Sequence, residues 1–130
     1  MGTILHNDPP HRDNTFGNDA IVYTWESLTV SDIYGNPVKM PGSADRSVQI
    51  TGALGSGGAI TMYGSNVVAP DLSDDDDWFV LRDAGFNPLV LSSLTGEEVV
   101  TLPLWIRPKL TAGDGETDLT VHLVMKGNHL

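Results

Sequence analysis

Residues 45–127 form a succession of short apolar segments that glycine, proline and aspartate interrupt. The segments follow one another at the spacing of about 8–12 residues that is typical of the strands in a β-sandwich or barrel. The connections between them are too short for crossover helices, so neighbouring strands are expected to pair antiparallel. The sequence therefore predicts an all-β fold, an antiparallel β-sandwich of about eight strands in two sheets.

Two strands are predicted from the alternation of their residues. In residues 21–30, Ile21, Tyr23 and Trp25 occupy alternate positions, which is the period of a strand. In residues 119–125, one face carries apolar side chains only. That apolar face consists of Leu119, Val121, Leu123 and Met125. The other predicted strands are residues 38–40, 48–54, 59–63, 78–82, 89–91, 97–102 and 104–106.

A short glycine-rich link, Gly55-Ser56-Gly57-Gly58, joins residues 48–54 to residues 59–63. Such a link between two strand-like segments predicts a β-hairpin. Gly52, inside the first of these strands, predicts a β-bulge.

The 130 residues are expected to form one domain preceded by an arm. We interpret residues 1–20 as a polar N-terminal arm and residues 21–130 as a single β-sandwich domain. The main apolar residues of the arm are Ile4, Leu5 and Phe16. Two interpretations stay open: a frayed chain end, or an arm that orders against a neighbouring subunit through these three residues.

The composition excludes several classes of function. The formal net charge of −10, from 17 acidic and 7 scattered basic residues, repels nucleic acid. No segment approaches the roughly 18 consecutive apolar residues of a membrane span, and the first residues do not resemble a signal peptide. The chain has no cysteine, which suits a reducing compartment or a particle assembled inside a cell.

Enzyme and cofactor motifs are not found in the sequence. There is no G-x-S-x-G nucleophile elbow, and the segment GALGSGG lacks the Lys-Ser/Thr and the helix of a phosphate-binding loop. The spacing of the four histidines matches no zinc signature. We therefore predict no catalytic, cofactor-binding or metal-binding residue, and expect His122 to face solvent or a partner.

The run Asp74-Asp75-Asp76-Asp77 is the obvious candidate for binding a cation, because calcium prefers several oxygen ligands. Consecutive residues of an extended chain point in opposite directions, however, so four in a row seldom converge on one ion. We favour a solvated acidic loop, with a calcium site as the alternative.

Arg107 follows the apolar residues 104–106 and precedes Pro108, which places it at the end of a predicted strand. A guanidinium in such a place usually pairs with a carboxylate. We predict a structural ion pair, with a direct contact to a partner subunit as the alternative. The sequence does not identify the carboxylate.

The three tryptophans, Trp25, Trp78 and Trp105, have two interpretations. In strands, tryptophan mostly fills cores and interfaces. The alternative is an exposed platform on which a sugar ring stacks.

The segments VQITGALG, GSN, WFVLRDAG, IRP and TDLTV, within residues 45–127, carry a resemblance to a known family. They resemble the head decoration or cement proteins of podovirus-like, tailed double-stranded DNA bacteriophages. The resemblance implies a jelly-roll β-sandwich that forms dimers or trimers on the outside of the capsid, across the seams between capsomers. It implies no active site.

The expected function is therefore that of a non-enzymatic structural virion protein without a cofactor. It would bind the major capsid protein on the outer surface of the phage head and stabilise contacts between capsid subunits, as a homo-oligomer. Neither nucleic acid nor a membrane is an expected partner. The alternative is a glycan- or receptor-binding β-sandwich module of a tail fibre or baseplate.

Overall fold

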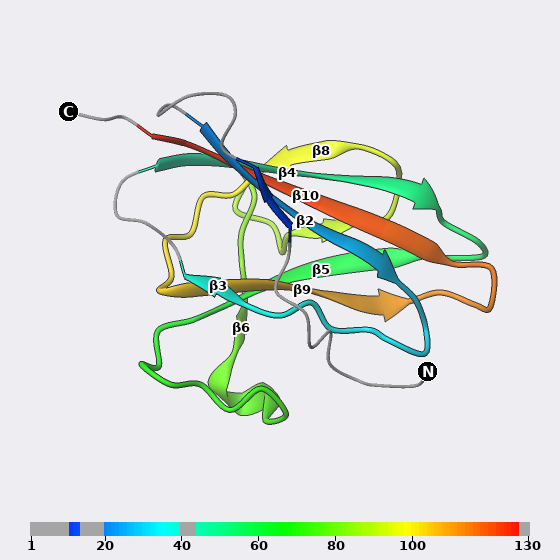
Figure 1. Ribbon diagram of the computed structural model, residues 1–130, viewed down its shortest axis with the longest axis horizontal. Coiled ribbons are helices and arrows are strands. Elements are labelled where there is room, and N and C mark those ends of the chain that lie inside the picture. The colour runs from blue at the N-terminus through cyan, green and yellow to red at the C-terminus, as the bar shows by residue number, and fades with distance from the viewer. Residues whose placement is uncertain (1–10, 14–19, 40–43, 128–130) are drawn as a thin grey trace.

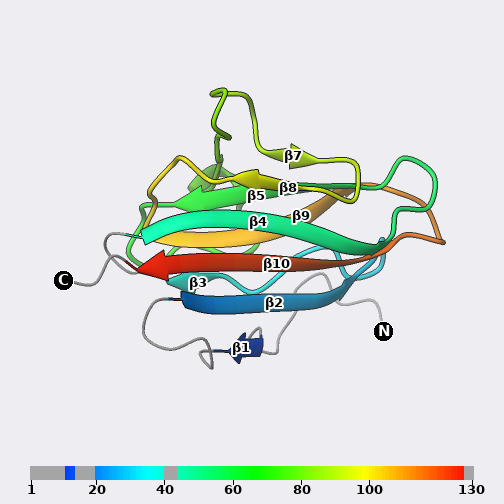
Figure 2. The same cartoon turned by 90° about the horizontal axis from the view of Figure 1, so that it is seen from above.

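The computed structural model describes residues 11–13, 20–39 and 44–127, and it is built of two antiparallel sheets packed face to face (Figures 1 and 2). The first sheet has the order β1 (His11–Asp13), β2 (Ala20–Leu28), β10 (Asp118–Gly127), β4 (Ala44–Ala53) and β8 (Gly96–Glu98). The second has the order β3 (Val38–Lys39), β9 (Trp105–Ala112), β5 (Ala59–Ser65) and β6 (Phe79–Val80), and β7 (Val90–Leu91) also pairs with β5.

The strand order is that of a jelly roll. One long ribbon is formed by four antiparallel pairings: β2 with β10, β3 with β9, β4 with β8, and β5 with β6 and β7. Successive pairs of this ribbon lie in alternate sheets, and β4 pairs with β10 while β5 pairs with β9 to complete the two sheets. The predicted all-β sandwich is confirmed, with ten strands in the described residues instead of about eight.

The predicted hairpin at Gly55-Ser56-Gly57-Gly58 is wrong, because β4 and β5 lie in different sheets. The link crosses from one sheet to the other, and glycine is needed there for close approach. A Cβ atom on Gly58 would lie 2.2 Å from the carbonyl oxygen of Leu54. A short glycine-rich link thus indicates a tight reversal of the chain, but not which sheet the next strand joins.

The bulge predicted at Gly52 is also wrong, because the register between β4 and β10 is unbroken. A bulge lies instead in β2, where the register against β10 shifts between Leu28 and Trp25. Ser27 adopts the left-handed conformation there, with φ of 59°. The extra residue turns both Trp25 and Leu28 into the core, although they stand three positions apart.

The core lies between the two sheets. The predicted apolar face of residues 119–125 is confirmed: all four of its side chains are buried. They pack against buried residues of the facing sheet, among them Ile60 and Met62 of β5 and Ile106 of β9. Within the described residues, no helix is long and apolar enough to cross a membrane.

Strand β9 does not end at Ile106, as the sequence predicted, but continues through Pro108 to Ala112. Proline is excluded from central strands because it has no N–H to donate. Here the carbonyl oxygen of Pro108 accepts from the backbone N–H of Gly35 at 3.0 Å. The edge of Pro108 that lacks an N–H donor therefore faces the irregular segment before β3. The hydrogen-bonded ladder between β9 and β5 stays intact.

Part of the segment expected as an arm belongs to the first sheet, since β1 pairs with β2 as its edge strand (Figure 2). The three candidate interface residues of the arm, Ile4, Leu5 and Phe16, lie outside the described residues. Their contact with a neighbouring subunit stays a prediction.

Candidate functional site

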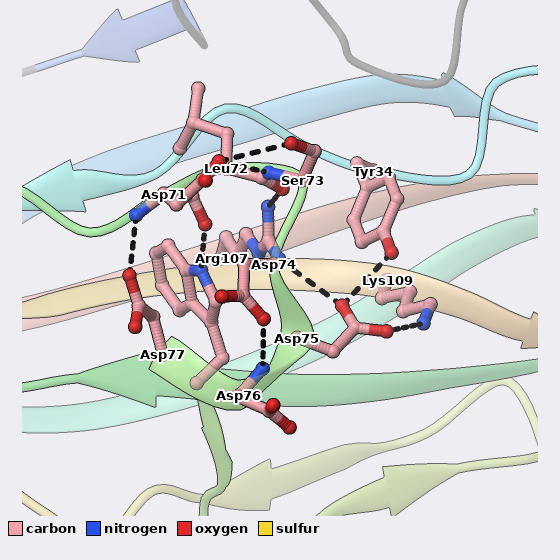
Figure 3. A network of polar contacts seen from close by, with 11 residues as sticks. Tyr34, Asp71, Leu72, Ser73, Asp74, Asp75, Asp76, Asp77, Arg107 and Lys109 are labelled. Atoms are coloured by element: carbon pink, nitrogen blue, oxygen red, sulfur yellow. Dashed lines mark hydrogen bonds and ion pairs between the residues drawn. The ribbon is translucent and has the colours of Figure 1, made fainter.

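The connection between β5 and β6, residues 66–78, folds over the outer face of the second sheet (Figure 3). It contains a short 3-10 turn, η2 (Asp75–Asp77). Because side chains alternate along β9, Ile106 faces the core, whereas Arg107 and Lys109 face outward beneath this connection. The two cations are therefore placed to hold the acidic connection on the sheet.

Arg107 has only 1% of its surface exposed, although it lies outside the apolar core. Its guanidinium lies between two aromatic rings, 4.4 Å from the centroid of Tyr34 and 4.0 Å from that of Trp78. Nη1 donates to the carbonyl oxygen of Leu72 at 2.8 Å, and Nη2 lies 3.7 Å from Oδ1 of Asp75. Asp75 is thus the carboxylate that the sequence did not identify, and little of the guanidinium is left for a second subunit.

Asp75 is the point where the connection, the sheet and the segment before β3 meet. Its Oδ1 accepts from the hydroxyl of Tyr34 at 3.0 Å, and its Oδ2 accepts from Nζ of Lys109 at 3.2 Å. Burial alone would raise the pKa of Asp75, but these hydrogen bonds and the charges of Lys109 and Arg107 outweigh burial and lower it. Burial lowers the pKa of Arg107, and the nearby Tyr34 and Asp75 oppose that effect.

The other aspartates of the connection bind backbone groups. Asp74 caps η2 by accepting from the N–H of Asp76 at 3.0 Å, and Asp77 accepts from the N–H of Asp71 at 2.7 Å. The indole of Trp78 donates to the carbonyl oxygen of Asp71 at 3.1 Å. The acidic run is therefore a folded segment rather than a purely solvated one. Across residues 11–13, 20–39 and 44–127, no three acidic or histidine side chains gather as metal ligands would.

Acidification is expected to loosen this connection. The folded-state pKa of Asp75 lies below its unfolded value, so its charge stabilises the fold above the unfolded value and this stabilisation disappears as the pH falls through the folded-state pKa. We expect the fluorescence of Trp78 to change below about pH 4, and Asp75→Asn to show the altered signal already at neutral pH.

The control for this titration is Glu116→Gln, which removes an exposed carboxylate from the opposite end of the sandwich. It should titrate like the wild-type protein. An unchanged fluorescence titration in Asp75→Asn would contradict the assigned role of Asp75.

The remaining predicted residues lie apart from one another. Trp25 is in the core, and Trp105 is half-buried with its indole N–H 3.3 Å from the carbonyl oxygen of Val68. His122 is half-buried, with Nε2 2.9 Å from Oγ1 of Thr51 on the neighbouring strand β4. The structure does not bring the tryptophans together into one exposed platform.

The segments that follow β5 and precede β9 lie at one end of the sandwich, on the left in Figure 1, and together they carry an exposed apolar surface. It comprises Val67 and Val68, which follow β5, and Leu102 and Leu104, which precede β9. We call these four residues the apolar end surface. Val68 is 81% exposed and Leu102 is 68% exposed.

The two chain segments that carry the apolar end surface are held side by side. Ser65, the last residue of β5, pairs with Trp105, the first residue of β9. The backbone N–H of Leu104 donates to Oδ1 of Asn66 at 3.1 Å, and the indole of Trp105 donates to Val68. The exposed side chains therefore stand on backbone that is already ordered.

Sequence reasoning missed this surface because exposure is a tertiary property. It also missed Tyr34, although the alternation of β9 offered a usable signal: Arg107 and Lys109 lie on the face opposite Ile106 and need anionic or aromatic neighbours there.

Comparisons of the chain with protein-family models, with curated proteins and with solved structures find no match. The geometry suits binding to a protein surface, with apolar side chains at one end of a rigid frame.

Proposed function

We propose that this protein is a structural virion protein that binds the outside of a phage capsid and stabilises contacts between major capsid protein subunits. The observation that carries the proposal is the apolar end surface on a jelly-roll frame. Exposed apolar surface rimmed by polar residues is typical of a site for protein–protein interaction. The resemblance of residues 45–127 to cement proteins of tailed phages supports the same function.

The fixed backbone of the apolar end surface supports a role in clamping. Association is opposed by the entropy lost when side chains and loops become ordered. Here the hydrogen bonds that Leu104 donates to Asn66 and Trp105 donates to Val68 order the two segments before any partner arrives. A dimer or trimer would add a second contact at high effective concentration, so modest affinity per site would hold a capsid seam.

The charge of the protein supports a position on the outer side of the shell. The net charge of −10 is repelled by packaged DNA. The aspartates of this connection lie close in sequence to the apolar end surface, because Val67 and Val68 belong to the same connection as Asp71 and η2. A capsid surface with apolar and basic side chains would complement it.

The alternative function, glycan or receptor binding on a tail fibre or baseplate, has less support. The platform considered for this function consists of the three tryptophans, whose rings would have to be exposed for a sugar to stack on them. Trp25 and Trp78 are buried, and Trp105 is half-buried against the segment that carries Val68. We therefore retain the capsid function as the proposal.

The test uses expanded capsid shells of the encoding phage, assembled without this protein. The purified protein should bind them and raise their thermal stability. Val68→Ser/Leu102→Ser should weaken binding by about 30-fold or more, because burial of two apolar side chains contributes roughly 2–4 kcal/mol. Sedimentation of shells with bound protein measures the affinity.

The matched control is Val30→Ser/Leu94→Ser, which removes two exposed apolar side chains from the opposite end of the sandwich. It should bind like the wild-type protein. Failure of the wild-type protein to bind the shells would rule out the proposal. Equal weakening of shell binding in both double variants would show that the apolar end surface is not the binding site.

A further inference from the structure

An exposed aromatic residue, Phe86, stands on a turn between β6 and β7. Its side chain is 72% exposed, and its backbone adopts the left-handed conformation with φ of 61°. That conformation favours glycine or asparagine and is unfavourable for a bulky side chain. Phe86 thus combines an exposed aromatic ring with a strained backbone, a combination that the core of the sandwich does not require.

Hydrogen bonds hold the turn in this conformation. Oδ1 of Asp83 accepts from the backbone N–H groups of Gly85 at 2.9 Å and Asn87 at 3.0 Å. The N–H of Phe86 donates to the carbonyl oxygen of Asp83 at 2.9 Å, and the N–H of Asp83 donates to that of Asn87 at 3.0 Å. Arg82 Nη1 donates to the carbonyl oxygen of Phe86 at 3.3 Å. The backbone from which the phenyl ring projects is therefore ordered.

The turn projects from the sandwich. In Figure 2 the connection between β6 and β7 extends beyond the edge strands, on the side away from β1. Its base is tied to the connection that leads to Leu102: the N–H of Val100 donates to the carbonyl oxygen of Arg82, and the N–H of Arg82 donates to Oγ1 of Thr101. Phe86 and the apolar end surface are thus joined through one ordered segment.

A shallow groove of about 400 Å³ separates the turn from the edge strand β8. Glu97 and Glu98 line it, and neither forms an ion pair with another residue of the described chain. Ala84 of the turn lines its other side. The turn that carries Phe86 therefore borders, at Ala84, a groove whose two glutamates form no ion pair within the described residues.

We infer that Phe86 is an anchor residue that inserts into an apolar pocket on a protein partner, and that lysine or arginine side chains beside the pocket enter the groove at Glu97 and Glu98. The inference rests on the proposed function, in which the partner is the capsid surface. The inference specifies that Phe86 enters the capsid surface and that basic side chains of the capsid lie around the pocket.

The physical reason is preorganisation. Aromatic anchors in desolvated pockets contribute much of the binding energy of protein interfaces. A side chain on a turn that is already ordered loses little entropy when it binds. The two unpaired glutamates supply charge complementarity, which selects a basic surround and raises the association rate.

The test separates stability from binding with the variant Phe86→Gly. Glycine suits a φ of 61°, so the unfolding midpoint should stay the same or rise. Binding to expanded capsid shells should weaken by about 30-fold or more, the loss expected for a hot-spot side chain. Glu97→Lys/Glu98→Lys should also weaken binding, with the larger effect at low salt.

The control is Leu94→Ala, which truncates an exposed side chain away from the turn and should bind like the wild-type protein. Wild-type binding of Phe86→Gly would overturn the inference and leave the proposed function standing. A loss of stability in step with the loss of binding would also overturn it, because Phe86 would then be structural. If the wild-type protein fails to bind the shells, the proposed function falls and this inference falls with it.

Discussion

Replacing Trp25 by alanine is expected to lower the free energy of unfolding by about 4 kcal/mol. Trp25 is 1% exposed and packs among the apolar side chains between the two sheets. Its ring lies against Gly35, where a Cβ atom would come within 2.6 Å of Cδ1 of the indole. The indole N–H also donates to the carbonyl oxygen of Asn36 at 2.7 Å. Alanine would leave a large cavity and would remove the hydrogen bond from the indole to Asn36.

The melting temperature of Trp25→Ala should fall on the order of 15 °C, which thermal unfolding followed by circular dichroism measures. Trp25→Phe is the matched control, because it keeps an aromatic ring in the core and loses the bond to Asn36 together with part of the indole volume. We expect it to lose about 1–2 kcal/mol. Equal losses in the two variants would show that the hydrogen bond, not the packing of the ring, stabilises this part of the core.

Replacing Arg107 by alanine has the second largest expected effect, a loss of about 3 kcal/mol. The change removes a charged hydrogen bond to the carbonyl oxygen of Leu72 and two cation–π contacts, with Tyr34 and Trp78. The ion pair with Asp75 adds little to this figure, because the Asp75 side chain is 58% exposed. The loss should appear in chemical denaturation as a lower midpoint.

Two matched variants separate the contributions at Arg107. Arg107→Lys keeps the charge but loses the planar stacking and the fork of donors, so it should recover less than half of the loss. Arg107→Met keeps much of the volume without a donor and should recover part of the packing. Full recovery by Arg107→Lys would show that charge alone holds the connection, contrary to the geometry.

Loss of Arg107 should also affect the apolar end surface, because the guanidinium helps to hold the connection that carries Val68. Residues 66–78 carry both Val68 and Leu72, and the guanidinium holds this connection at Leu72. Arg107→Ala is therefore expected to weaken binding to capsid shells as well as stability. Its effect on binding should be smaller than that of Val68→Ser/Leu102→Ser, which removes the contacting side chains themselves.

Much of the architecture was predictable from residues 45–127. The alternation in residues 119–125 identified the buried face of β10, because side chains of a strand point alternately to either side. A charged residue at the end of the apolar segment 104–106 predicted that Arg107 pairs with a carboxylate, and the structure places Asp75 beside it. Both predictions depend on neighbours along the chain and on general properties of side chains.

The candidate surfaces were not predictable in the same way. The sequence predicted a hairpin at Gly55-Ser56-Gly57-Gly58 because a hairpin turn and a tight link between two sheets both use glycine for close approach. Only the pairing of β4 with β10 and β8 shows that this link crosses between the sheets. The left-handed conformation of Phe86 has no marker in the sequence, since phenylalanine is a poor choice for it.

The sequence by itself determined that this chain is an all-β protein with a formal net charge of −10, because strand periodicity and charge are properties of the chain. Only the tertiary structure decided that the strands wind as a jelly roll, that Asp75 meets Arg107 across 32 positions, and that apolar side chains gather at one end. Those facts depend on contacts between distant segments. Such contacts are selected by the packing of the whole core, and no local pattern encodes them.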